Sequence, residues 1–209
     1  RFRDLVFFMA DRRTIGAAAA SGTSMTLANR ITIGRLVLIP VFIVLVMTYT
    51  KDQQWLRYAA LAVFAAAAIS DAVDGFIARA YNQKTKLGAV LDPLADKLLI
   101  NLALVFLAVN NHLATPIPPW FPVLILGRDV IIVIGAYLIN EYFGPVRARP
   151  QISGKLTTLL QMVLIFAVLL ELPSRFIYGT LYVTLFVAVF SFADYLRAGI
   201  KQVGNEDQA

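Results

Sequence analysis

The chain of 209 residues contains no cysteine and a single histidine, His112. The absence of thiols excludes disulfides and thiolate chemistry, although it does not identify a cellular compartment. It also argues against a zinc-type site, because Cys and His are the main zinc ligands in proteins. Charged residues are scarce as well, at 15% of the chain.

Hydrophobic residues make up 59% of the sequence, against about 45–50% in a soluble domain. The mean hydropathy is +0.71. Apolar runs of roughly 17–25 residues can cross a bilayer as helices, which satisfy their own backbone hydrogen bonds there. The sequence therefore predicts an all-α integral membrane protein with six transmembrane helices. The expected spans are Ile33–Tyr49, Trp55–Arg79, Gly88–Val109, Trp120–Ile139, Leu156–Leu172 and Phe176–Leu196.

Lys and Arg lie mostly in alternate connections between these spans, which predicts the orientation of the chain. The formal charge of +6 then indicates anionic lipid headgroups and phosphates as partners, and no nucleic acid. We expect a multi-pass protein of the cell (inner, cytoplasmic) membrane with both termini in the cytoplasm. The opposite connections hold few charges, and Glu171 and Arg175 are interpreted as loop charges there.

The first 24 residues are kept apart from this fold. Phe2–Met9 is apolar but too short to span a membrane. Residues 1–24 are interpreted as a lead-in or a remnant of the expression vector, with a helix in the membrane interface as the alternative. Residues 25–209 are expected to form the six-helix domain.

Four aspartates fall in or beside two neighbouring apolar spans, at Asp71, Asp74, Asp92 and Asp96. Spacings of three and four residues place each pair on one face of a helix. If the two spans form an antiparallel hairpin, Asp71 and Asp96 are symmetric about a turn near residue 83, and so are Asp74 and Asp92. Asp71 would then lie roughly 12 Å from the end of its helix. The four carboxylates are therefore expected to converge at two matching depths.

Converging carboxylates repel one another, and hard divalent cations relieve that repulsion. We expect two Mg²⁺ or Mn²⁺ ions, which would clamp the oxygens around a reacting phosphorus. The alternative is structural: the aspartates cap helices or pair with Arg79 and Lys97. Asp92 before Pro93, for example, fits an N-cap followed by proline at the first helical position.

Small residues and a cation accompany the first pair. Gly75 and Ala78 would allow a nucleotide to approach the backbone, or would serve tight helix packing. Arg79 lies one turn beyond Gly75 and would hold a pyrophosphate, or act as a membrane-surface anchor.

The pattern Asp71-x2-Asp74-Gly75-x2-Ala78-Arg79-x8-Gly88-x3-Asp92-x3-Asp96 resembles the signature of the CDP-alcohol phosphotransferase family. This resemblance implies a cytoplasm-facing polar cavity, usually in a homodimer. It implies that Asp71, Asp74, Asp92 and Asp96 hold the metals and that Asp96 is the general base. The CDP-binding residues it implies are Asp74, Gly75, Ala78, Arg79 and Gly88.

Within the family, the chain is most similar to phosphatidylglycerophosphate synthases, which implies transfer of a phosphatidyl group from CDP-diacylglycerol to glycerol 3-phosphate with release of CMP. The flanking segments Asn29–Thr32 and Gly154–Gln161 carry this likeness. The alternatives are a lipid alcohol acceptor, as in cardiolipin synthases of the CDP-diacylglycerol type, or inositol phosphate. A metal or proton transporter is the alternative from another class, although its carboxylates would be spread over more helices.

An acceptor phosphate requires cations. Arg147, Arg149 and Lys155 lie on the predicted cytoplasmic side, where they would bind that phosphate or simply face the membrane surface. Arg128 lies inside an apolar span, where an ionised side chain is costly and suggests a site. It would either bind the acceptor phosphate or pair locally with Asp129.

Overall fold

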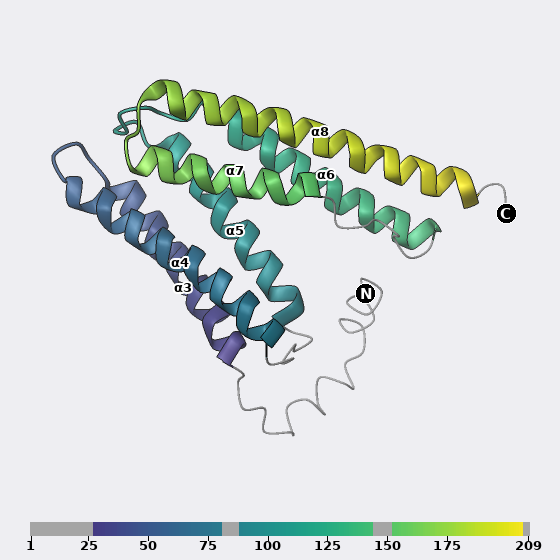
Figure 1. Ribbon diagram of the computed structural model, residues 1–209. Coiled ribbons are helices and arrows are strands. Elements are labelled where there is room, and N and C mark those ends of the chain that lie inside the picture. Colours follow the sequence, from purple (N-terminus) through teal and green to yellow (C-terminus); the bar gives the residue numbers. More distant parts are fainter. Residues whose placement is uncertain (1–26, 81–87, 144–151, 207–209) are drawn as a thin grey trace.

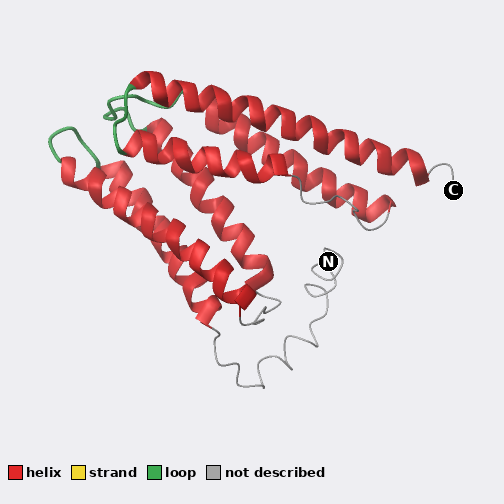
Figure 2. Ribbon diagram, in the orientation of Figure 1, coloured by secondary structure: helices red, strands yellow, loops and turns green. Residues whose placement is uncertain are grey.

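The computed structural model describes residues 27–80, 88–143 and 152–206. Side chains are described within residues 34–70, 95–139, 141–142, 153–197 and 199–200. The predictions for residues 1–24 and for a turn near residue 83 lie outside this part of the chain. Within it, all regular structure is helical, as Figure 2 shows. The helices are α3 (Leu27–Thr48), α4 (Gln54–Ala80), α5 (Gly88–Val109), α6 (Trp120–Phe143), α7 (Ile152–Leu169) and α8 (Ser174–Glu206).

Each helix corresponds to one predicted span, and α5 has the predicted limits. The largest difference is at the end of α8, which continues ten residues beyond Leu196. Its last part includes the polar residues Lys201, Asn205 and Glu206, so the apolar run that predicted this helix ends before the helix does. A helix needs only its own backbone hydrogen bonds, so it can continue past the apolar region that reveals it in the sequence.

The helices form two groups that α5 connects. In Figure 1, α3 and α4 lie side by side on one flank, while α6, α7 and α8 form the other. Helix α5 packs against α3 in the first group and against α6 and α7 in the second. The helix that carries Asp92 and Asp96 is therefore the central element of the bundle.

The interior changes character along the bundle. Toward the connections that follow α3, α5 and α7 the core is mostly hydrocarbon, although Arg57, Asn110 and Thr115 are also buried there. In this part the rings of Phe42, Phe64 and Phe166 pack with centroids 5.1–5.7 Å apart. Toward the end where α4 finishes and α5 begins, buried polar side chains appear on five helices. The buried side chains are Arg35 of α3, Asp129 of α6, Thr157 and Gln161 of α7, and Ser191 of α8. Asp96 of α5 is partly buried. Because the helical segments that carry the aspartate motif also lie at this end, it is where a functional site is expected.

The apolar end is held by specific contacts. The Asn110 amide, just after α5, donates to the carbonyl of Val46 at 2.6 Å and of Tyr49 at 3.3 Å, which satisfies carbonyls at the end of α3. The Thr115 and Ser174 hydroxyls are 2.9 Å apart and tie the following loop to the start of α8. These bonds fix how the helices meet at this end.

Glu171 does lie in the turn between α7 and α8, as expected, but its charge is paired within the protein. Its carboxylate Oε2 lies 2.7 Å from Nη1 of Arg57, whose side chain is only 7% exposed, and the Tyr49 hydroxyl donates to Oε1 at 3.3 Å. The Arg57 contact is an ion pair by distance, although its angles are not those of a hydrogen bond. Arg57 lies near the start of α4. Arg175 is exposed, but it lies in the first turn of α8.

Glu171 also ends α7 in an uncommon way. Leu172 N–H donates to the carbonyl of Ala167 and Glu171 N–H to that of Val168, both at 3.0 Å, which is the Schellman pattern. That pattern requires a left-handed residue, usually glycine, and Glu171 has a φ of 51°. The chain thus accepts backbone strain at the residue that pairs with Arg57.

Two helices are long and apolar enough to cross a membrane, over Trp120–Ile139 and Ser174–Arg197. Shorter apolar helical stretches lie in α3, α4 and α7. The core helix of a soluble protein would be mostly buried, whereas only 11% of the apolar window of α6 is buried inside the protein. Exposed Val, Ile and Phe side chains on α6 and α8 likewise indicate a membrane protein.

Candidate active site

The aspartate motif is carried by continuous helix. Helix α4 extends through Asp71 and Asp74, and α5 extends through Asp92 and Asp96. Their spacings of three and four residues therefore do correspond to shared helical faces. The interpretation of Asp92 as an N-cap is wrong, because α5 begins four residues earlier, at Gly88.

The meeting of the four carboxylates stays a prediction. The side chains of Asp71, Asp74 and Asp92 lie outside the described part, and so do those of Ala78 and Arg79. Helices α4 and α5 run in opposite directions, and the end of α4 and the start of α5 lie at the same end of the bundle in Figure 1. Helix α3 packs against both and is the main neighbour of α4, so three helices surround this region.

A chain of polar contacts joins α5, α6 and α8 at the polar end. The ammonium of Lys97, next to Asp96, donates to Oδ2 of Asp129 at 2.7 Å. Arg128 Nη1 donates to the other oxygen, Oδ1, at 2.7 Å, and its Nη2 donates to the Ser191 hydroxyl at 2.7 Å. Gly154 of α7 lies beside the same hydroxyl, since a Cβ built there would be 3.9 Å from Ser191 Oγ. The four side chains thus lock three helices together around one carboxylate.

These contacts test two ideas from the sequence. Lys97 pairs with Asp129, whereas the structural alternative paired it with the motif aspartates. Arg128 does pair locally with Asp129, and both of its terminal nitrogens are engaged. Binding of an acceptor phosphate by Arg128 stays a prediction. Lys155 is exposed near the start of α7, and Arg147 and Arg149 lie outside the described residues.

Sequence reasoning gave too little weight to Arg35 and Lys97. Arg35 of α3 is only 1% exposed, which makes it the largest fully buried polar side chain in the described part. It lies in the same polar half of the bundle as Asp129. The available signal was the same for both residues: a cation within an otherwise apolar helix, which is costly unless it serves a site or a pair.

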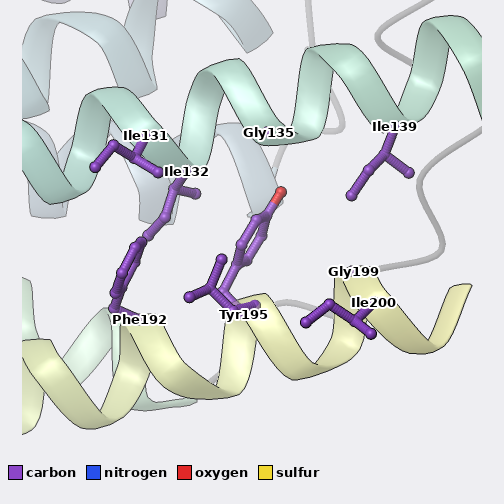
Figure 3. Close-up of a pocket in the computed structure, with 9 residues that line it drawn as sticks. Ile131, Ile132, Gly135, Ile139, Phe192, Tyr195, Gly199 and Ile200 are labelled. Carbon is purple, nitrogen blue, oxygen red and sulfur yellow. The ribbon is translucent and has the colours of Figure 1, made fainter. Parts of the chain in front are cut away.

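A separate apolar groove of about 280 Å³ lies between α6 and α8 (Figure 3). It runs between two points where these helices touch, the Arg128–Ser191 hydrogen bond and the close approach of Ile139 to Gly199. The Tyr195 ring extends from α8 toward α6 across it, and the other lining residues are aliphatic, Phe192 or glycine. Because hydrocarbon lines it, the groove offers no groups for phosphoryl chemistry, and the polar end remains the candidate site.

A comparison with protein families identifies the family of the chain. The model of the CDP-alcohol phosphatidyltransferase family matches residues 25–192, which include the whole aspartate motif. The chain belongs to this family.

Three similar proteins carry names from phosphatidylglycerophosphate synthesis. A probable phosphatidylglycerophosphate synthase of Mycobacterium tuberculosis is 33% identical over 193 residues, covering 90% of this chain and 88% of that protein. A CDP-diacylglycerol–glycerol-3-phosphate 3-phosphatidyltransferase of Aquifex aeolicus is 32% identical over 87% of this chain and the full length of that protein. The Escherichia coli protein of the same name is 31% identical over 80% of this chain and 91% of its own length.

The residues of the motif suit the divalent metals that this family implies. Its donors are carboxylates only, which are the ligands that Mg²⁺ and Mn²⁺ prefer, and the helical spacing presents them in pairs. Among the side chains that the structure describes, no group of three or more potential ligands gathers. Only Asp96 of the four belongs to that part, so the metal site stays a prediction.

Proposed function

We propose that the protein transfers a phosphatidyl group from CDP-diacylglycerol to glycerol 3-phosphate and releases CMP. The observation that carries this proposal is the complete aspartate motif on two helices at the polar end of the bundle. Family membership and the names of the similar proteins from Aquifex aeolicus and Escherichia coli support the choice of substrates.

The proposed mechanism assigns different residues to the metal ions, the CDP moiety and the acceptor phosphate. Asp71, Asp74, Asp92 and Asp96 would hold two divalent ions, Mg²⁺ or Mn²⁺. When bound, these ions supply positive charge that neutralises the pyrophosphate and the departing CMP. Asp74, Gly75, Ala78, Arg79 and Gly88 would bind the CDP moiety. Arg147, Arg149 and Lys155, with Arg128 deeper in the bundle, would attract the acceptor phosphate.

Asp96 would act as the general base. It accepts the proton of the acceptor hydroxyl, whose oxygen then attacks the phosphorus that carries the diacylglycerol. A new bond forms between that oxygen and phosphorus, and the bond from phosphorus to the bridging oxygen of CMP breaks. CMP leaves with the electron pair. Positioning and electrostatic stabilisation supply most of the acceleration, as in phosphoryl transfer generally.

We further propose six membrane crossings, with both termini and the active-site cavity on the cytoplasmic side of the cell membrane. The support is the Lys and Arg placement, since the basic clusters alternate with sparsely charged connections. A homodimer is proposed from the family, and the exposed apolar surface of α6 is compatible with a partner there. The six-helix domain is proposed to extend from residue 25 to 209.

We expect the purified protein to release CMP from CDP-diacylglycerol when glycerol 3-phosphate and Mg²⁺ or Mn²⁺ are present. EDTA should abolish this release and added Mn²⁺ should restore it, because four unscreened carboxylates cannot bind a pyrophosphate. CMP release is followed by chromatography.

Phosphatidylglycerol and inositol phosphate serve as the competing acceptors. Faster CMP release with either of them would contradict glycerol 3-phosphate as the acceptor. Metal flux into proteoliposomes without any CMP release would contradict the transferase and indicate transport.

A further inference from the structure

The polar chain at the site end carries more positive than negative charge. Asp129 supplies one carboxylate, and Lys97 and Arg128 each donate to one of its oxygens at 2.7 Å. The three side chains therefore have a net charge of +1 in a bundle with an apolar surface. Asp96 and the other motif aspartates lie at the same end of the bundle, so carboxylates of the protein as well as a bound anion can balance this charge.

Of the three charged side chains, only that of Lys97 is largely exposed. Asp129 and Arg128 are enclosed, with side chains 11% and 14% exposed, whereas the Lys97 side chain is 49% exposed. Lys97 lies nine residues after the start of α5, about 14 Å along the helix. At that depth an ammonium that faced lipid would be very costly, so its exposed side is expected to face a polar cavity.

Lys97 follows Asp96 at the polar end of the central helix α5, where adjacent side chains point about 100° apart, so Lys97 would line the α6 side of the candidate active site. A lysine ammonium has three N–H donors, and the bond to Asp129 uses one of them. Its position is also constrained, because Asp129 is fixed by Arg128, which is anchored in turn by the Ser191 hydroxyl of α8. A positioned cation beside a site for phosphate chemistry is suited to an anionic oxygen.

From this arrangement we infer that Lys97 is a substrate-binding residue, which donates to a phosphate oxygen of the substrate, and that Asp129 is the residue that positions it. The inference rests on the proposed function. Either the pyrophosphate of the CDP-linked lipid or the phosphate of the acceptor provides such an oxygen, and the experiment distinguishes them. Arg128 donates to the other oxygen of Asp129 and is itself held by the Ser191 hydroxyl.

The test compares Lys97→Met, Lys97→Arg and Asp129→Asn with the unaltered full-length protein in detergent micelles. Lys97→Met keeps the Arg128–Asp129 pair and nearly the same side-chain length, so the fold should survive. Lys51→Met is the matched control, because Lys51 is an exposed lysine in the connection between α3 and α4, at the apolar end of the bundle. Three quantities are measured: CDP binding by calorimetry with Mn²⁺, the KM for glycerol 3-phosphate, and the melting temperature.

Loss of one charge-assisted hydrogen bond should weaken binding by about 10- to 100-fold in Lys97→Met. Weaker CDP binding with an unchanged acceptor KM would identify the pyrophosphate as the ligand. A raised acceptor KM with intact CDP binding would identify the acceptor phosphate. Lys97→Arg should recover part of the loss, and Asp129→Asn should affect the same substrate as Lys97→Met.

Two results would overturn the inference. One is a Lys97→Met protein that binds CDP and the acceptor as well as Lys51→Met does. The other is a loss of binding that accompanies a lower melting temperature and that Lys97→Arg does not recover, which would make the lysine structural. If the unaltered protein releases no CMP with any acceptor, the proposed function fails, and CDP binding still reports on Lys97.

Discussion

Replacing Asp96 by Asn should lower CMP release by about 10²–10⁴-fold while some CDP binding survives. The amide keeps the size of the side chain but cannot accept the proton of the acceptor hydroxyl, and general-base catalysis contributes an effect of this size. Asp71, Asp74 and Asp92 remain in place to hold a metal ion for the nucleotide. CMP release and CDP calorimetry on the same preparation measure the two effects separately.

Asp52→Asn is the matched control, because Asp52 is an exposed aspartate in the loop after α3 at the apolar end. It should release CMP at the unaltered rate. An Asp96→Asn protein that turns over as fast as this control would remove Asp96 from the general-base role. Loss of CDP binding together with turnover would instead make Asp96 essential for holding the nucleotide.

Replacing Glu171 by Ala should destabilise the protein by about 3–5 kcal/mol, although the residue is far from the candidate site. The change leaves the Arg57 guanidinium buried without the carboxylate that lies 2.7 Å away. It also leaves a non-glycine residue at a φ of 51°, so no backbone strain is relieved. The fall in melting temperature in detergent micelles measures the effect.

Glu171→Gly separates the two contributions. Glycine loses the ion pair but adopts a positive φ freely, so it should be more stable than the Ala variant by about 1 kcal/mol. The double change of Arg57→Met with Glu171→Gly should recover most of the stability, since neither charge then remains buried. Arg175→Met, which removes an exposed cation at the same end, should leave the melting temperature unchanged. Equal melting temperatures for Glu171→Ala and Arg175→Met would show that the pair contributes nothing.

The helices were predictable because their signal is local. Each of the described helices coincides with an apolar run in the sequence, and Gly88–Val109 was located at both ends. The aspartate motif was equally local, since spacings of three and four residues within a helix define a shared face without reference to other helices. Positions where helices continue into polar sequence, such as the end of α8, carry no such signal.

The partners of the charged residues were not predictable in the same way. Lys97 and Asp129 are 32 residues apart, and Arg57 and Glu171 are 114 apart, so spacing along the chain says nothing about their contacts. The pair of Arg128 with Asp129 was one of two alternatives that the sequence offered, because the two residues are adjacent. Its second bond, to Ser191 on α8, depends on how α6 packs against α8.

The sequence alone determined that this protein is helical and apolar, and that one stretch carries paired carboxylates of the CDP-alcohol phosphatidyltransferase type. Hydropathy and helical periodicity act over a few turns, and both can be read from neighbouring residues. Only the tertiary structure decided that α5 is central, which buried polar side chains gather at each end of the interior, and which cation pairs with which carboxylate. Those features depend on the packing of helices far apart in the chain, where burial makes an unpaired charge costly and so selects its partner.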